Sequence, residues 1–253
     1  MDTQSLPTFS ETDLRDTSPA MKNGLLATIT PAGLPHVTLL SSLMACSPNG
    51  LSFGQFTEGM SKQHILLNPK TGFLIMSLDK NLWRGKATYT HCARNGTEYD
   101  YYNNVPMFRY NAYFGVHPVY YLDLVGHTGK SPLPKNRIIF AAIRTMLART
   151  LGRKTEKQPV LNGWTRAFLD KIDNLTFLSY IGADGYPAII PAIQAQSLDG
   201  QYVILSTSVY ADKLQAIPAG APMAVFSLAQ TMEDVLLRGS YQGIAGSAGS
   251  KSE

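Results

Sequence analysis

The residues best suited to chemistry lie in one short segment, Gly59-Met60-Ser61-Lys62, at the start of a predicted helix. A helix N-terminus presents free backbone N–H groups and the positive end of the helix dipole, which together favour an anion. Ser61 adds a hydroxyl donor and Lys62 adds a positive point charge. We therefore expect this segment to bind an anionic group such as a phosphate. The alternative is that Lys62 is a solvated surface lysine.

A second lysine occupies an equivalent place later in the chain, because a series of landmarks recurs in the same order. The turn glycines are 152 residues apart, far more than the period of a solenoid repeat. The recurring landmarks are the turn glycines Gly33 and Gly185, the lysines Lys62 and Lys213, and the pairs Arg84-Gly85 and Arg238-Gly239. We interpret the chain as an internal duplication of two domain-sized units. The second site is expected to be degenerate, because Pro191 stands in a strand where the first copy has polar residues.

Composition limits the classes of protein to consider. The chain has 253 residues, 44% of them hydrophobic and only 16% charged, which indicates buried interfaces between the halves or between subunits. Cys46 and Cys92 have no CxxC partner, so we expect no zinc site or disulfide framework, and we expect a reducing cytoplasm. The N-terminus lacks the basic and apolar regions of a secretory signal. The longest apolar run, 138–148, is too short to cross a membrane.

The positive charge is concentrated in one connector. Residues 135–157 carry seven basic residues and one acid, whereas the rest of the chain has 15 basic and 17 acidic residues. Apolar residues within 136–151 recur at spacings of three and four, which predicts an amphipathic helix. This helix could contact an acidic partner protein or an anionic membrane surface, and we do not expect nucleic acid. The simpler alternative is that its apolar face packs on the rest of the chain.

Short β-branched and apolar runs separated by Gly, Pro and Asn predict a mainly β chain with short helices. Ser10 and Asp13 form a candidate capping box near the N-terminus. The predicted organisation is an N-terminal arm at 1–20, a first domain at 21–130, a basic helical connector at 131–173, a second, degenerate repeat at 174–243 and a flexible tail at 244–253.

These motifs resemble those of the FMN-binding split-barrel superfamily, which includes pyridoxamine 5'-phosphate oxidase, the small FMN-binding proteins and the flavin reductases. The likeness rests on Gly33-Leu34-Pro35-His36-Val37, on 59–64, on Asn68-Pro69 and on Arg84-Gly85, and it covers 21–130 better than 175–242. It implies two six-stranded antiparallel split barrels joined by a helical connector, the second incomplete or completed by a strand from elsewhere. Family members are usually dimers, so we expect an intrachain pseudo-dimer or a homodimer.

The resemblance also implies roles for individual residues. Lys62 would bind the FMN phosphate, and the strand that begins at His36 would lie beside the flavin ring. Arg84 would add charge at the phosphate or bind an anionic substrate, unless it forms a surface ion pair. The candidate cofactor-binding residues are Lys62, Ser61, Met60, Thr38, Ser41, Ser42, Gln55, Thr57, Arg84 and Lys213. We identify no catalytic residue and no metal ligand. F420 is the alternative cofactor because it also presents a phosphate, and we do not expect haem.

The implied activity is that of a flavin-dependent oxidoreductase. It would pass hydride or electrons from a reduced donor, such as a nicotinamide or another small-molecule redox substrate, to an acceptor. Two alternatives stay open. One is a non-catalytic flavin-, F420- or haem-binding module that docks a partner through the basic helix. The other is a structural subunit that binds no cofactor.

Overall fold

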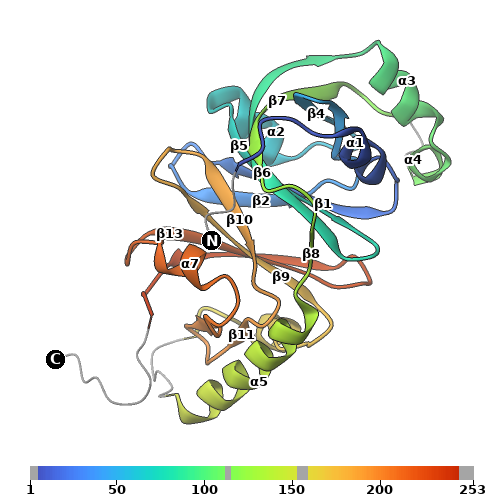
Figure 1. The fold of residues 1–253 in the computed structure, drawn as a ribbon. Helices are drawn as coiled ribbons and strands as arrows, with labels where there is room; N and C mark the ends of the chain where they lie inside the picture. The colour runs from blue at the N-terminus through green and yellow to red at the C-terminus, as the bar shows by residue number, and fades with distance from the viewer. Residues whose placement is uncertain (1–4, 112–114, 153–158, 245–253) are drawn as a thin grey trace. The chain divides into compact units, whose positions relative to one another are not determined.

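The computed structural model describes residues 5–111, 115–152 and 159–244 (Figure 1). The fold is mainly β, and the described strands pair in antiparallel fashion. The chain divides into two compact units: unit 1 contains 1–133 and 181–189, and unit 2 contains 134–180 and 190–253. No described helix is long and apolar enough to span a membrane.

Unit 1 is built on one sheet with the strand order β2-β1-β5-β6-β7-β4-β3, and β8 pairs with β6. The long strand β6 and its neighbour β7 connect the β1–β2 hairpin to the β3–β4 hairpin, because β5 joins β6 on one side and β4 joins β7 on the other. The strands are β1 (Lys22–Ile29), β2 (Pro35–Leu39), β3 (Met44–Ser47), β4 (Gly50–Gly54), β5 (Lys70–Ser77), β6 (Asn81–Ala93), β7 (Val119–His127) and β8 (Ser131–Pro132).

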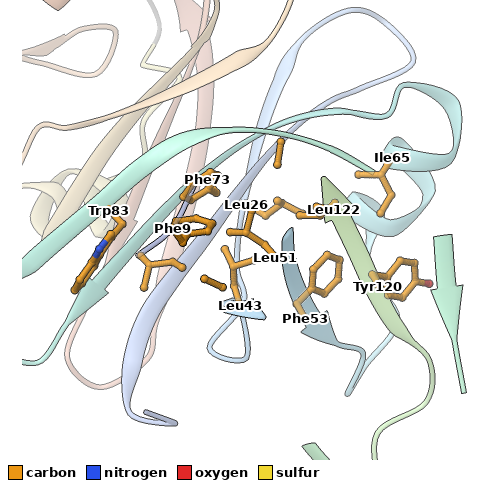
Figure 2. Close-up of a cluster of buried hydrophobic side chains, with 13 residues drawn as sticks. Phe9, Leu26, Leu43, Leu51, Phe53, Ile65, Phe73, Trp83, Tyr120 and Leu122 are labelled. Atoms are coloured by element: carbon orange, nitrogen blue, oxygen red, sulfur yellow. The ribbon is translucent and has the colours of Figure 1, made fainter. Parts of the chain in front are cut away.

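The sheet of unit 1 encloses an apolar core, shown in Figure 2. Phe53 of β4 stacks on Tyr120 of β7, with ring centroids 5.0 Å apart and an interplanar angle of 3°. Burying each large apolar side chain contributes about 1.5–3 kcal/mol to folding. The labelled members of this core are Phe9, Leu26, Leu43, Leu51, Phe53, Ile65, Phe73, Trp83, Tyr120 and Leu122.

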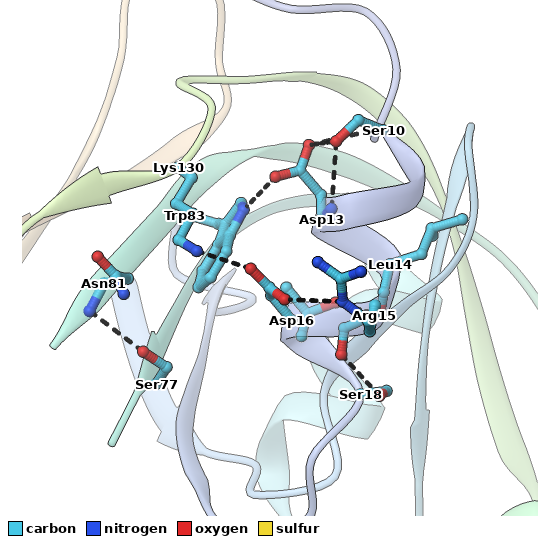
Figure 3. Close-up of polar contacts among 11 residues, drawn as sticks. Ser10, Asp13, Leu14, Arg15, Asp16, Ser18, Ser77, Asn81, Trp83 and Lys130 are labelled. Atoms are coloured by element: carbon cyan, nitrogen blue, oxygen red, sulfur yellow. Dashed lines mark hydrogen bonds and ion pairs between the residues drawn. The ribbon is translucent and has the colours of Figure 1, made fainter. Parts of the chain in front are cut away.

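Helix α1 (Glu11–Thr17) fastens the N-terminal segment to this core (Figure 3). Ser10 caps the helix and forms the reciprocal capping box with Asp13, as the sequence predicts. In this box Oδ2 of Asp13 accepts from Ser10. Oδ1 of Asp13 accepts a hydrogen bond of 2.7 Å from the indole N–H of the fully buried Trp83. The segment predicted as an arm thus contributes Phe9 and Asp13 to the interior, and residues 1–4 lie outside the described chain.

Three further helices belong to unit 1: α2 (Met60–Leu67), α3 (Thr97–Asn104) and α4 (Pro106–Asn111). Tyr102 anchors α3, because it is completely buried and its hydroxyl lies 2.9 Å from both Ser52 Oγ and the Ser42 carbonyl oxygen. Tyr102 therefore holds α3 against the β3–β4 hairpin.

Unit 2 combines helices with a second set of strands. A four-stranded sheet has the order β10-β9-β13-β14, and β11 and β12 form a separate two-stranded sheet. The elements are α5 (Lys135–Leu151), α6 (Gly163–Leu169), β9 (Leu175–Ile181), β10 (Pro187–Pro191), β11 (Gln196–Ser197), β12 (Val203–Ile204), α7 (Ala211–Gln215), β13 (Pro222–Leu228) and β14 (Asp234–Ser240). Ile181 of β9 and residues 187–189 of β10 belong to unit 1. Arg153, Lys154 and Lys157 of the basic connector and 245–253 of the predicted tail lie outside the described residues.

The hairpin turns confirm the predicted duplication. Gly33 and Gly185 both adopt a positive φ, 73° and 77°, which suits a residue without a Cβ. In the first copy the Gly33 N–H donates to the Thr30 carbonyl at 2.8 Å. In the second copy the Gly185 N–H donates to the Gly182 carbonyl at 2.9 Å. The same turn thus recurs at the spacing found in the sequence.

Strand register repeats as well. Leu25 of β1 pairs with Leu74 of β5, and Phe177 of β9 pairs with Phe226 of β13, so both partners are shifted by the same 152 residues. The same shift relates the β3–β4 hairpin to β11–β12, where the equivalent pairs are Met44 with Ser52 and Gln196 with Ile204. No strand follows β14 within the described part of unit 2, so β11 and β12 are not joined to the larger sheet as β3 and β4 are through β7.

Candidate functional site

The start of α2 forms the centre of the candidate site. Gly59 occupies the N-cap and has no side chain, so no side-chain acceptor caps the N–H groups of the first turn. Met60 is exposed, whereas Ser61 and Lys62 are buried, with 3% and 8% of their surface exposed. The helix ends at Leu67 because Asn68 precedes Pro69 and takes an extended conformation. This arrangement leaves the positive end of a short helix open at Met60.

Two hydroxyl groups meet beside this helix start. Thr38 Oγ1 is in hydrogen-bond contact with Ser61 Oγ, although the two residues are 23 positions apart in the sequence. Strand β2 points His36 and Thr38 to the same face because side chains alternate along a strand. Thr38 Oγ1 also lies 3.1 Å from His36 Nε2. The contact between Thr38 and Ser61 therefore fixes the start of α2 against β2.

Lys62 brings a positive charge into a partly desolvated position. Its ammonium group donates a hydrogen bond to the Thr57 carbonyl oxygen, and Thr57 itself is exposed. Burial lowers the pKa of Lys62, and the nearby carboxylate of Glu58 acts in the opposite direction. An amine held this way interacts more strongly with an anion than a fully solvated lysine does, because water screens it less.

Gln55 connects Glu58 to the core. The Tyr120 hydroxyl donates to Gln55 Oε1 at 3.0 Å, and Gln55 Nε2 donates to Glu58 Oε1 at 3.0 Å. Gln55 is buried, so these bonds orient its amide group. Four candidates from the sequence lie together at the start of α2, where Thr38 contacts Ser61 and Lys62 contacts Thr57. A fifth candidate, Gln55, reaches this group only through Glu58.

Two buried histidines lie behind the helix start, and sequence reasoning missed them. The rings of His36 and His64 are perpendicular, with centroids 5.0 Å apart. His64 Nδ1 lies 3.1 Å from Thr28 Oγ1 of β1. Two signals in the sequence could have indicated both histidines. His36 is two residues before Thr38 on a strand, and His64 is three residues after Ser61 on a helix, so each shares a face with a candidate residue. No comparable signal marks Thr28 or Glu58.

The remaining candidates in unit 1 have different surroundings. Ser42 Oγ donates to the Gly54 carbonyl at 3.2 Å and accepts from the Gly54 N–H at 3.1 Å, so this hydroxyl ties the loop after β2 to the end of β4. Ser41 is half-buried in that loop. Arg84 is half-buried on β6 opposite Leu74 of β5, and its carbonyl accepts from the Thr128 N–H.

The second copy departs from this pattern at the equivalent positions. Lys213 N–H donates to the Tyr210 carbonyl, as Lys62 N–H donates to the Gly59 carbonyl, but the Lys213 side chain is exposed. Counted from the helix N-caps Gly59 and Tyr210, Asp212 stands at the position of Ser61. The position of Thr38 corresponds to Ile190, which is buried. A carboxylate and an apolar side chain have thus replaced the two hydroxyls.

Among the described residues, no group of three or more His, Cys, Asp or Glu side chains is arranged to hold a metal ion. Both cysteines, Cys46 and Cys92, are free.

Comparison with known proteins gives matches among solved structures. No family model matches the chain, and no curated protein matches it. The chain is similar to an FMN-binding protein from Syntrophomonas wolfei (13% identity, 48% of this chain, 88% of that chain, TM-score 0.39). It is also similar to a candidate pyridoxamine 5'-phosphate oxidase from Lactobacillus delbrueckii, with 17% identity over 49% of this chain and 98% of that chain and a TM-score of 0.37. A third similar structure is an F420 reductase, with 14% identity over 47% of this chain and 98% of that chain and a TM-score of 0.35. Each match covers about half of this chain.

Proposed function

We propose that this chain is an FMN-binding flavoprotein that holds its cofactor in unit 1 and acts as an oxidoreductase. The observation that carries the proposal is the donor set at the start of α2. Lys62 supplies a cation, Ser61 and Thr38 supply two hydroxyls, and the helix N-terminus has no side-chain cap. A phosphate dianion requires this combination of a positive charge with N–H and O–H donors.

The state of Lys62 also favours an anionic ligand. Its ammonium group now bonds to the neutral Thr57 carbonyl, and its pKa is lowered by burial. A phosphate oxygen would replace a neutral acceptor with a charged one, and a charge-assisted bond is roughly twice as strong as a neutral one. Glu58 opposes a dianion, so the proposal requires Gln55 to hold the Glu58 carboxylate away from the phosphate.

Unit 2 is proposed to be a second, shortened split barrel that has lost its own site. The argument rests on the substitutions Asp212 and Ile190 at the positions of Ser61 and Thr38, together with the exposure of Lys213. A carboxylate next to the lysine repels a phosphate. The proposal also includes an intrachain pseudo-dimer or a homodimer, and a cytoplasmic location.

A bound flavin would supply hydride and single-electron transfer, whereas the protein supplies binding, orientation and access. The residues of this chain would anchor the phosphate at Lys62 and Ser61, and the contact between Ser61 and Thr38 would fix the direction of both hydroxyls. The donor is proposed to be a nicotinamide or another small-molecule redox substrate.

The binding part of the proposal is tested by the cofactor itself and by a matched pair of variants. The protein is purified without added cofactor, and the compound released by heat is identified by mass. Lys62→Ala should weaken FMN binding by about 10- to 100-fold, since a hydrogen bond to a charged group contributes about 1.5–3 kcal/mol. Lys213→Ala, the equivalent change in the second copy, should leave the affinity unchanged. Equal affinities of Lys62→Ala and wild type, or release of F420 in place of FMN, would refute it.

The oxidoreductase part needs a separate assay. The FMN-loaded protein should oxidise NADH or NADPH under anaerobic conditions faster than the same concentration of free FMN does. The Lys62→Ala variant should lose this excess in proportion to its loss of bound FMN. A protein that binds FMN but gives no excess rate with either nucleotide would instead be a flavin-binding module.

A further inference from the structure

Helix α5 of unit 2 turns its larger apolar face outward. Its buried residues are Ile138 and two residues with small side chains, Ala141 and Thr145. Six large apolar side chains lie on the surface, with exposed fractions between 46% and 83%: Ile139, Phe140, Ile143, Met146, Leu147 and Leu151. The alternative in which the predicted apolar face packs on the rest of the chain is therefore wrong for Ile139, Ile143, Met146 and Leu147.

These side chains form a continuous stripe. Ile139, Ile143, Leu147 and Leu151 follow one another every four residues, which places them on the same side of the helix. The stripe runs along α5, which has 17 residues and is about 25 Å long at 1.5 Å per residue. Figure 1 shows the course of this helix. A contiguous apolar surface of this kind indicates contact with a partner or a membrane.

The charges of α5 restrict what can cover the stripe. The helix carries Lys135, Arg137, Arg144 and Arg149 and has no acidic residue. Arg149 is neutralised by Asp170 at 2.8 Å, and Arg137 donates to the Ser208 carbonyl at 2.8 Å. Packing α5 on α5 of a second copy would bring like charges together. Charge complementarity therefore favours an anionic occupant.

We propose that α5 lies in the surface of an anionic phospholipid bilayer, with its stripe among the acyl chains and Lys135, Arg137 and Arg144 at the lipid phosphates. The six stripe residues offer no hydrogen-bonding group, whereas a protein interface has about one hydrogen bond per 100–200 Å². Acyl chains require none. An amphipathic helix with basic residues beside a Phe- and Leu-rich face is typical of such interfacial binding.

A cavity of about 770 Å³ lies beside the stripe, between α5, α6 and β11. Its charged lining residues are Arg149, Arg166, Asp170 and Asp199. Two arginines and two aspartates balance in charge, so the proposal assigns the lipid phosphates to Lys135, Arg137 and Arg144 and not to this cavity. The proposal is independent of flavin binding, because unit 2 contains all of these residues.

The test is flotation of the full-length chain with unilamellar vesicles. Wild type should float with vesicles of phosphatidylcholine and phosphatidylglycerol, and at least tenfold less with phosphatidylcholine alone. High salt should release it, because screening weakens the attraction to the leaflet. Leu147→Glu/Leu151→Glu should reduce flotation at least tenfold, and Lys135→Glu/Arg144→Glu should abolish the preference for the anionic lipid.

The matched control is Leu66→Glu/Leu67→Glu on α2, because these two leucines are also strongly exposed, at 65% and 70%. This variant should float like wild type. The proposal is overturned if wild type does not float, if the control loses flotation as well, or if neutral vesicles bind equally. It is also overturned if wild type binds polyglutamate but not vesicles, which would assign the stripe to an acidic protein. A dimer that Leu147→Glu/Leu151→Glu dissociates, without any vesicle binding, would assign it to a second copy.

Discussion

Replacing Asp13 by alanine should destabilise unit 1 far more than a change at a surface acid normally does. Asp13 accepts the indole N–H of Trp83 at 2.7 Å and, through its other oxygen, the N–H and the hydroxyl of Ser10 at 3.0 and 2.8 Å (Figure 3). Trp83 is fully buried, so no water can replace the lost acceptor. The change therefore leaves a buried donor unpaired and opens half of the α1 capping box.

The magnitude follows from these two losses. An unpaired buried donor costs about 1–3 kcal/mol, and a lost helix cap costs about 1 kcal/mol. We therefore expect Asp13→Ala to lower the free energy of unfolding by about 2–4 kcal/mol. At roughly 2–4 °C per kcal/mol for a unit of this size, the melting temperature should fall by about 5–15 °C.

The assay is a double-mutant cycle with Trp83→Phe, in which urea unfolding is followed by far-ultraviolet circular dichroism. In the Trp83→Phe background the indole donor is absent, so Asp13→Ala should cost only the cap term of about 1 kcal/mol. Asp16→Ala is the matched control on the same helix, because Asp16 forms a partly exposed ion pair with Lys130, and the unfolding midpoint should change little. Additive effects of Asp13→Ala and Trp83→Phe would refute the assigned hydrogen bond.

The remaining predictions concern unit 1. Gly72→Ala should cost about 1–3 kcal/mol by thermal unfolding, because a Cβ there would lie 2.1 Å from the Pro187 carbonyl oxygen. Burial lowers the pKa of Lys22 to about 8, so the folded state should become more stable as pH rises from about 8 towards 10.5, and Lys22→Met should stabilise it by about 1–2 kcal/mol at pH 7. Burial raises the pKa of Asp13, but hydrogen bonds from Trp83 and Ser10 outweigh it and hold the pKa below 3.8. The stability that Asp13 contributes should therefore be complete above pH 3.8 and decrease in acid titrations below it.

Local signals in the sequence were sufficient to predict the duplication and the start of α2. The turn at Gly33 requires a positive φ, and Asn68-Pro69 ends a helix, so both features depend on residues a few positions apart. The pairing register of the strands is the same in both copies, because each strand has a face that must be buried. A slip of one residue would turn the apolar side chains of that face to solvent. These features could be predicted without knowing which strands are neighbours.

Features that depend on distant residues could not be predicted in this way. The contact between Thr38 and Ser61 requires α2 to pack on β2, and the engagement of Ser42 by Gly54 requires the end of β4 to reach the loop after β2. The outward apolar face of α5 is a further case, because periodicity shows that a helix is amphipathic but not which face its own unit covers. The roles of the candidate cofactor residues stay predictions.

The two copies share the strand pairing that maintains the fold, but they differ at the residues of the candidate site. Unit 2 keeps the pairing register of β1 with β5 and of β3 with β4, since register depends on the apolar pattern that fills the core. It does not keep the hydroxyls, because Ile190 and Asp212 stand in place of Thr38 and Ser61. Restoring them with Ile190→Thr and Asp212→Ser should still not create a phosphate site, since Lys213 is exposed and its charge is screened by water. A second FMN bound by that variant, detected as two flavins per chain, would show that burial of the lysine is not essential.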